Sequence, residues 1–89
     1  MSLSPYGYTN VEEVPMFTMR EASSIVRELR ERRGWSQSEL ASEARVSRSF
    51  IADVEAGKPT VEAAKLFDAL QALGFEVALR SLDDGQVRW

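Results

Sequence analysis

The chain has 89 residues and a formal net charge of −3, and it contains neither cysteine nor histidine. This length suits one domain with a modest core, so a second subunit would be a natural source of further buried area. The missing cysteine excludes disulfides and thiolate metal sites, and the missing histidine removes the usual general base and the commonest transition-metal ligand. We therefore expect no metal site and no cofactor.

The N-terminal segment, residues 1–17, contains Pro5, Gly7, Asn10 and Pro15 and shows no hydrophobic periodicity. This pattern predicts an irregular or disordered arm, whose aromatic residues either dock on the domain or belong to a flexible lead. The segment lacks the basic region and apolar run of a signal peptide, and no stretch of the chain approaches the length of a membrane span. We therefore expect a cytoplasmic protein.

A first helix is predicted over residues 19–33. Thr18 and Glu21 have the spacing of a capping box, in which a hydroxyl and a carboxylate each satisfy a backbone N–H at the start of a helix. Gly34 suits the left-handed position that ends such a helix. The apolar stripe between these ends has helical spacing and consists of Ala22, Ile25, Val26 and Leu29.

A second and a third helix are predicted on either side of a tight turn. Ser36 and Glu39 repeat the capping-box spacing, and Ser47 can cap the following helix. The connection at residues 45–46 is too short for anything but a tight turn. The apolar side chains that would lock the two helices together are Leu40, Ala41, Val46, Ile51 and Val54.

A fourth helix is predicted to begin at Pro59 and Thr60 and to end at Gly74. Its apolar positions recur every three residues and are Val61, Ala64, Phe67, Leu70 and Leu73. Together with the three preceding helices, this helix would complete a domain spanning residues 18–74.

The pattern changes to a period of two after the fourth helix. Phe75, Val77 and Leu79 share one face, which predicts a strand over residues 75–81. Nothing else in the chain resembles a strand, and a lone strand has unpaired edges. The simplest partner is the same strand of a second subunit, paired antiparallel about a two-fold axis. Residues 82–89 are expected to form a flexible polar tail.

The charges are unevenly distributed along the chain. The segment from Arg27 to Lys58 carries seven basic and six acidic residues, whereas the rest carries four basic and eight acidic residues. The acidity therefore lies in the flanks, and the middle of the chain can present a basic face.

Two short helices joined by a tight turn describe a helix-turn-helix, in which the second helix fits the major groove of DNA. The segments Arg30–Ala41, Val46–Ile51 and Glu55–Thr60 resemble the Xre/Cro-type (lambda-repressor-like) helix-turn-helix domain over about residues 20–73. This resemblance implies an all-α fold of four helices that binds double-stranded DNA. Arg45 departs from the family, which usually has glycine in this turn because φ tends to be positive there.

The resemblance also implies roles for individual residues. The residues that would face base edges are Arg48, Ser49, Ala52 and Asp53. The residues that would contact phosphates are Gln37, Arg45, Ser47 and Lys58. Arg48 is the best candidate for a bidentate contact with guanine, whereas Asp53 would repel phosphate but can accept a hydrogen bond from cytosine. Arg30 and Glu55 match a family ion pair with a structural role, and Phe50 is interpreted as partly buried packing.

The C-terminal segment indicates which type of protein within this family the chain resembles. A four-helix domain followed by one strand, a polar stretch and a terminal Trp89 is similar to the HipB-type antitoxins, which repress their own operon and bind a HipA-like kinase toxin. The resemblance implies a homodimer on a palindromic operator, with Trp89 as an anchor on the toxin. The alternatives are a stand-alone Xre-family regulator and a protein whose main partner is a protein, with DNA secondary.

Catalysis is not expected. The sequence contains no nucleophile–base pair, glycine-rich phosphate loop or metal cluster. The segment Gly57–Thr60 connects two helices, and the glycines that would make it a phosphate loop are missing.

Overall fold

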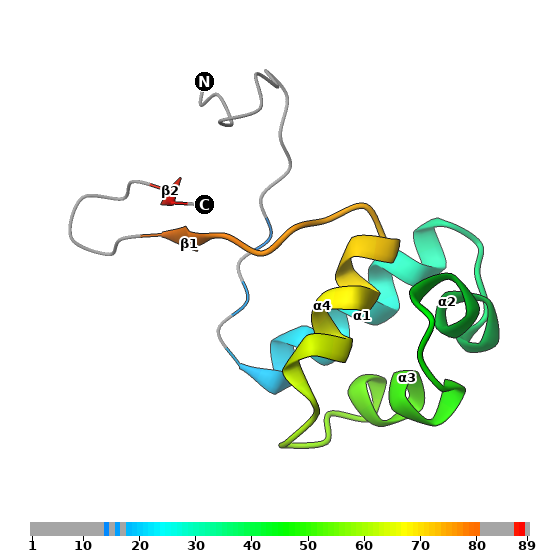
Figure 1. Cartoon of the computed structure of the whole chain (residues 1–89). Helices are drawn as coiled ribbons and strands as arrows, with labels where there is room; N and C mark the ends of the chain where they lie inside the picture. The colour runs from blue at the N-terminus through cyan, green and yellow to red at the C-terminus, as the bar shows by residue number, and fades with distance from the viewer. Residues whose placement is uncertain (1–13, 15, 17, 81–86, 89) are drawn as a thin grey trace.

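The computed structural model describes residues 14, 16, 18–80 and 87–88 of the chain (Figure 1). The helices in this part are α1 (Met19–Arg32), α2 (Gln37–Ala44), α3 (Arg48–Glu55) and α4 (Ala63–Ala72). The strands are β1 (Leu79–Arg80) and β2 (Val87–Arg88). The four helices agree with the predicted all-α, four-helix domain. Except for residues 14 and 16, the arm predicted over residues 1–17 lies outside the described residues, and so does Trp89. The structure of the arm and the role of Trp89 therefore stay predictions.

Hydroxyl side chains begin three of the helices. The Thr18 hydroxyl accepts from the backbone N–H of Glu21 at 3.1 Å, and the Ser47 hydroxyl accepts from that of Phe50 at 3.0 Å. Ser36 and Glu39 form a reciprocal capping box, with N···O distances of 3.0 and 2.8 Å. The predicted starts of these helices are therefore confirmed, because each cap satisfies backbone donors that have no partner inside the helix.

The core is built from apolar side chains of all four helices. Its largest fully buried members are Val26, Leu40, Ile51 and Val54. Helix α2 packs against α3 and α4, and α1 packs against α3. The predicted lock between the second and third helices is thus present, with Val46 packed against its edge. Its effect is to hold α3 against the rest of the domain.

Helix α4 differs from its prediction in its start and in its buried face. It begins at Ala63 with Glu62 as N-cap, whereas Val61 packs against the core from outside the helix. The side chains that it contributes to the core are Leu66, Ala69, Leu70 and, at its C-cap, Leu73. Ala64 is exposed, and Phe67 is 45% exposed. The predicted face was right at Leu70 and Leu73 and wrong at Ala64 and Phe67, because residues three apart drift by about 60° per step around a helix of 100° per residue.

All four helices end in the same kind of backbone motif. A left-handed residue stands directly after α2 and one residue beyond the C-cap of α1, α3 and α4, and the backbone N–H that follows it bonds to a carbonyl five residues earlier. In α4 these residues are Gly74 and Phe75, whose N–H donates to the Leu70 carbonyl at 2.9 Å. Phe75 therefore belongs to a helix cap and not to a strand, which shortens the strand predicted over residues 75–81.

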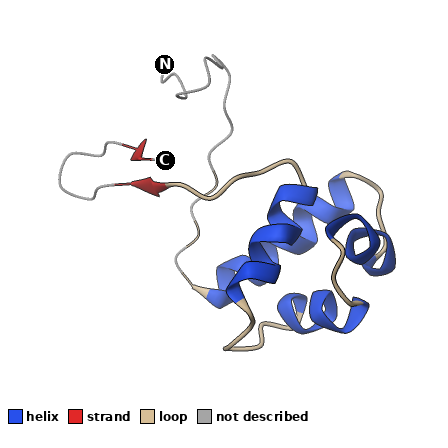
Figure 2. Ribbon diagram, in the orientation of Figure 1, coloured by secondary structure: helices blue, strands red, loops and turns tan. Residues whose placement is uncertain are grey.

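The strand pairing also differs from the sequence expectation. Strand β1 pairs antiparallel with β2 of the same chain, with Leu79 opposite Arg88 and Arg80 opposite Val87. The expectation that nothing else in the chain resembles a strand was wrong, because two residues are too few to display a period. The strands lie apart from the helical cluster (Figure 2). In the described part of the chain, no helix combines the length and the hydrophobicity needed to cross a lipid bilayer.

Candidate nucleic-acid interface

Helix α3 exposes a mainly polar face to solvent and buries its apolar face in the core. Arg48 and Ser49 are exposed, and Ala52 and Asp53, one turn later, are partly buried. Ile51 and Val54 lie in the core on the opposite side. The four residues expected to face base edges therefore form one stripe along α3, a geometry that fits a helix lying in a groove.

Arg45 occupies the left-handed position between α2 and α3. Its φ of 58° and ψ of 42° make it the non-glycine residue with positive φ among the described residues. The equivalent position is glycine at the ends of the other helices, namely Gly34, Gly57 and Gly74. A side chain in this conformation costs about 1–2 kcal/mol, because Cβ approaches the following carbonyl oxygen. The exposed Arg45 thus introduces strain into the turn together with a positive charge.

We expect Arg45→Gly to raise the free energy of unfolding by about 0.5–1 kcal/mol. The strain energy that is relieved exceeds the entropic cost of ordering glycine, which is more flexible in the unfolded chain. Urea denaturation measures this change. Arg45→Ala is the matched control, because it removes the same charge but keeps Cβ. Equal stability of the glycine and alanine variants would mean that the turn carries no strain.

Two residues expected to contact different parts of DNA lie together at the end of α3. Lys58 Nζ lies 3.5 Å from Asp53 Oδ2, and both side chains are about half exposed. An exposed pair of this kind contributes at most about 1 kcal/mol, so Lys58 can exchange this carboxylate for a phosphate. Phe50, beside them, packs partly against the core, in agreement with its interpretation as packing.

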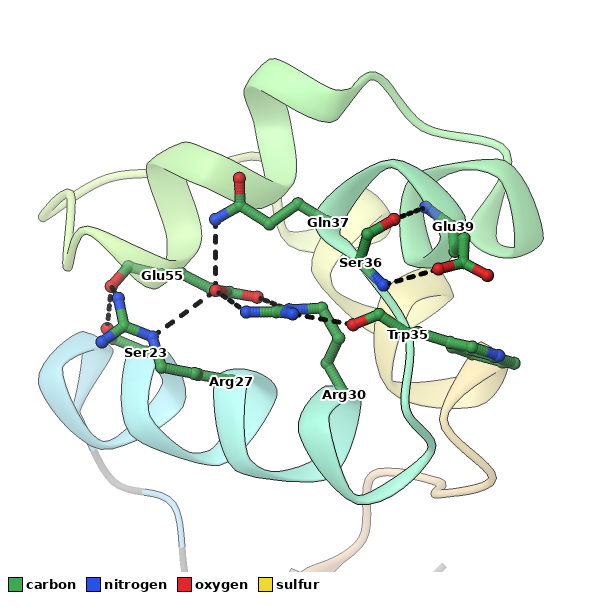
Figure 3. Close-up of polar contacts among 8 residues, drawn as sticks. All are labelled: Ser23, Arg27, Arg30, Trp35, Ser36, Gln37, Glu39 and Glu55. Atoms are coloured by element: carbon green, nitrogen blue, oxygen red, sulfur yellow. Dashed lines mark hydrogen bonds and ion pairs between the residues drawn. The ribbon is translucent and has the colours of Figure 1, made fainter.

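The Glu55 carboxylate is buried where α1, α2 and α3 meet, with 1% of its side chain exposed (Figure 3). Arg30 Nε donates to Oε2 at 2.6 Å, and Arg30 Nη2 donates to Oε1 at 2.8 Å. Arg30 Nη1 also donates to the Trp35 carbonyl at 2.8 Å. The expected ion-pair partners therefore form a bidentate contact that fixes the end of α3 to α1.

Gln37 takes part in the same cluster. Its Nε2 donates to Glu55 Oε1 at 3.2 Å, so the residue expected to contact phosphate also links the start of α2 to the ion pair. An amide nitrogen carries two hydrogens, and the bond to Glu55 uses one of them. The second hydrogen is suited to a phosphate oxygen.

Ser23 and Arg27, which the sequence pattern had not singled out, both contact the end of α3. The Ser23 hydroxyl donates to the Glu55 carbonyl oxygen at 2.6 Å, and Arg27 Nη2 donates to the same oxygen at 3.3 Å. This carbonyl lies in the last turn of α3, where helical carbonyls lack intrahelical partners. The sequence contains a signal for these contacts, because Ser23, Arg27 and Arg30 recur at i, i+4 and i+7 and so share one face of α1.

Both members of the ion pair are held in their charged forms. Burial of Glu55 opposes its ionisation, but hydrogen bonds from Arg30 and Gln37 outweigh this effect and hold the pKa of the carboxyl below its ordinary value. The hydrogen bond to Glu55 raises the pKa of Arg30. The cluster is therefore an ion pair at neutral pH.

The residues expected to mediate dimerisation lie in different environments. Phe75 packs partly against the helical core, Val77 is 45% exposed, and Leu79 lies in β1. The structure therefore does not gather these three residues on one regular strand.

Comparison with known proteins gives the family. Residues 24–82 match the family described as a helix-turn-helix domain. The chain belongs to this helix-turn-helix family. A curated relative, the "Uncharacterized HTH-type transcriptional regulator y4mF" of Sinorhizobium fredii (strain NBRC 101917 / NGR234), is 40% identical over 60 residues, covering 67% of this chain and 79% of the relative. The domain is of the Xre type, in a family of DNA-binding regulators and not of enzymes.

Solved helix-turn-helix structures share the fold. The HipB chain of a "HipB-O4 20mer complex" has a TM-score of 0.71 at 21% identity and covers 79% of this chain and 99% of that chain. A chain of a "HipA-HipB-O2-O3 complex" has a TM-score of 0.70, with the same identity and coverage. The clp gene regulator ClgR of Corynebacterium glutamicum is 32% identical, with a TM-score of 0.58, over 73% of this chain and 85% of that chain. The domain thus resembles HipB in fold.

Proposed function

We propose that this helix-turn-helix protein is a sequence-specific transcriptional repressor that inserts α3 into the major groove of its operator. The polar stripe on α3 carries this proposal, since Arg48, Ser49, Ala52 and Asp53 lie opposite the helix face that anchors α3 in the core. Arg48 reads guanine, and Asp53 accepts from cytosine. The protein acts in the cytoplasm and without catalysis.

Phosphate contacts on both sides of this stripe orient the domain on DNA. Gln37 and Arg45 stand at the two ends of α2, Ser47 caps α3, and Lys58 follows α3. Arg45 and Lys58 are exposed cations, and such contacts supply affinity that does not depend on sequence. Their placement around α3 supports a docking geometry in which the backbone of DNA is held while α3 reads the bases.

A homodimer would bind a palindromic operator, with two copies of α3 about 34 Å apart. Strand β1 has a partner in β2, but a two-stranded ribbon still has open edges that can pair with a second copy. Val77 is an exposed apolar side chain close to β1 along the chain. In this proposal, Phe75, Val77 and Leu79 contribute to the dimer contact.

The simplest test is binding of the full chain to DNA from upstream of its own gene, measured by fluorescence anisotropy against a duplex of mixed sequence. We expect tighter binding to the upstream fragment by a factor of about 10³ or more, as is typical of specific regulators. Light scattering in solution measures whether the protein is a dimer. Equal affinity for the two duplexes would contradict repression of its own promoter.

We further propose that the protein is the antitoxin of a HipA-like kinase toxin. The likeness in fold to HipB, together with the occurrence of HipA and HipB in one solved complex, supports this step. Trp89 would be the anchor on the toxin, because a buried tryptophan is a frequent interface hot spot.

Removal of Trp89 tests the antitoxin role. We expect it to weaken binding to the kinase encoded beside this gene by about 30-fold or more, the effect of losing a hot-spot side chain, and to leave DNA binding unchanged. Calorimetry with the purified kinase measures the first quantity and anisotropy the second. Trp89→Phe is the control, because it keeps an aromatic ring and should retain part of the binding to the kinase. Full binding by the truncated chain would remove Trp89 from the toxin interface, and the lack of any kinase partner would favour a stand-alone regulator.

A further inference from the structure

Besides Arg30, two donor side chains from different helices contact one oxygen of Glu55. Arg27 Nε of α1 lies 3.5 Å from Glu55 Oε1, and Gln37 Nε2 of α2 lies 3.2 Å from the same oxygen. Figure 3 shows Arg27 and Gln37 reaching this carboxylate from separate ribbons. Both nitrogen atoms lie within 3.5 Å of the same oxygen atom, so the two donors are close enough for one phosphate group to span them.

Glu55 is one carboxylate in contact with two arginines, Arg27 and Arg30. Arg30 makes the two short bonds to Glu55, at 2.6 and 2.8 Å, and is itself largely buried. Arg27 makes only longer contacts, at 3.3 and 3.5 Å, and its side chain is 55% exposed. Glu55 therefore pairs mainly with Arg30, and Arg27 presents its positive charge at the surface.

We propose that Arg27 and Gln37 together bind one phosphate group of the DNA backbone. A phosphodiester has two non-bridging oxygens, and the neighbouring donors are a guanidinium and the second amide hydrogen of Gln37. Glu55 holds both donors in place, because its Oε1 contacts both side chains. This inference rests on the proposed DNA binding and adds a contact from α1 that the helix-turn-helix itself does not supply.

The salt dependence of binding to a mixed-sequence duplex tests this contact without knowledge of the operator. Each neutralised phosphate contributes about 0.9 to the slope of log affinity against log salt concentration. Arg27→Ala should therefore lower the slope by about one per subunit. The loss of affinity should be about eightfold per subunit at 0.1 M salt and should vanish near 1 M salt.

Three control variants distinguish a phosphate contact from a general effect of surface charge or of packing between α1 and α3. Arg32→Ala removes the same charge from the same helix, and the Arg32 side chain is similarly exposed, at 52%. Arg32 lies about 140° from Arg27 around α1, so this variant should leave the slope unchanged. Ser23→Ala removes the other donor to the Glu55 carbonyl and should also leave the slope unchanged. Arg27→Lys keeps the charge and should retain the slope.

The outcomes distinguish failure of this inference from failure of the proposed function. If the wild-type chain does not bind duplex DNA at low salt, the proposed function itself fails. If the wild-type chain binds and Arg27→Ala keeps the full slope, or if Arg32→Ala lowers it equally, the phosphate contact is overturned. Thermal melting followed by circular dichroism shows that each variant is folded. Should Arg27→Ala unfold, Arg27→Gln decides, since it keeps a donor to the Glu55 carbonyl but removes the charge.

Discussion

Glu55→Gln should lower the free energy of unfolding by about 3–5 kcal/mol, the usual cost of removing one partner from a buried ion pair. The substitution keeps the shape of the side chain but leaves the Arg30 guanidinium, whose side chain is 12% exposed, without its counter-charge. A small domain has a total stability of only about 5–15 kcal/mol, so the variant would be close to unfolding. Urea denaturation followed by circular dichroism measures the change.

Glu39→Gln is the matched control for this prediction. It makes the same chemical change at an exposed carboxylate of the α2 capping box, where glutamine can keep the reciprocal bond. Its cost should stay below about 1 kcal/mol. Similar losses in the two variants would show that burial of the Glu55 pair carries no special stability.

The same carboxylate predicts a dependence of stability on pH. The pKa of Glu55 is lowered in the folded protein, so its contribution is fully present above the unfolded value of about 4.3 and is lost as the pH falls through the folded value. Wild-type protein should therefore lose more stability than Glu55→Gln as the pH is lowered from about 5. Unfolding curves at several pH values check this, and parallel curves for the two proteins would contradict it.

Arg48→Ala should lower the preference for operator over mixed-sequence DNA by about 5- to 150-fold per subunit, because a bidentate contact with guanine discriminates by about 1–3 kcal/mol. Arg48 is the first residue of α3 and is exposed, so its removal should disturb only the bases that it reads. The affinities for an operator selected from a random pool and for a mixed-sequence duplex measure this ratio.

Lys58→Ala is the control for sequence reading. Lys58 follows α3, is exposed and pairs with Asp53, so we expect its loss to weaken binding to both duplexes alike. An unchanged preference in Arg48→Ala would place the reading surface elsewhere. A loss of preference in Lys58→Ala would show that this lysine does more than contact phosphate.

Features that depend on neighbouring residues were predictable. The caps at Thr18, Ser36 and Ser47 are local hydrogen bonds within four residues, and each marks the start of a helix. The positive φ of Arg45 agrees with the family resemblance, which implies glycine in this turn, and does not follow from the local sequence. The stripe on α3 follows from the helical period once its start at Ser47 is known.

The misjudged features involve competition between local patterns and packing. Phe75 and Val77 alternate as in a strand, but the N–H of Phe75 is used to cap α4. Phe67 has the hydrophobicity of a core residue, yet Leu66 and Ala69 fill the space beneath α4. Hydrophobicity alone cannot decide which of several apolar residues faces the core, because this choice depends on the angle at which the helix packs.

Local patterns in the sequence were enough to predict the order and approximate extent of the four helices, the tight turn between α2 and α3, and the polar stripe of α3. Each of these results from hydrogen bonds or periodicity within a few residues. Helix packing, in contrast, brings Ser23 to the carbonyl of Glu55, 32 residues away, and brings Arg27 and Gln37 to the same carboxylate oxygen. Such contacts depend on how α1 lies across the end of α3, an arrangement set by packing of the whole core and not by any local pattern.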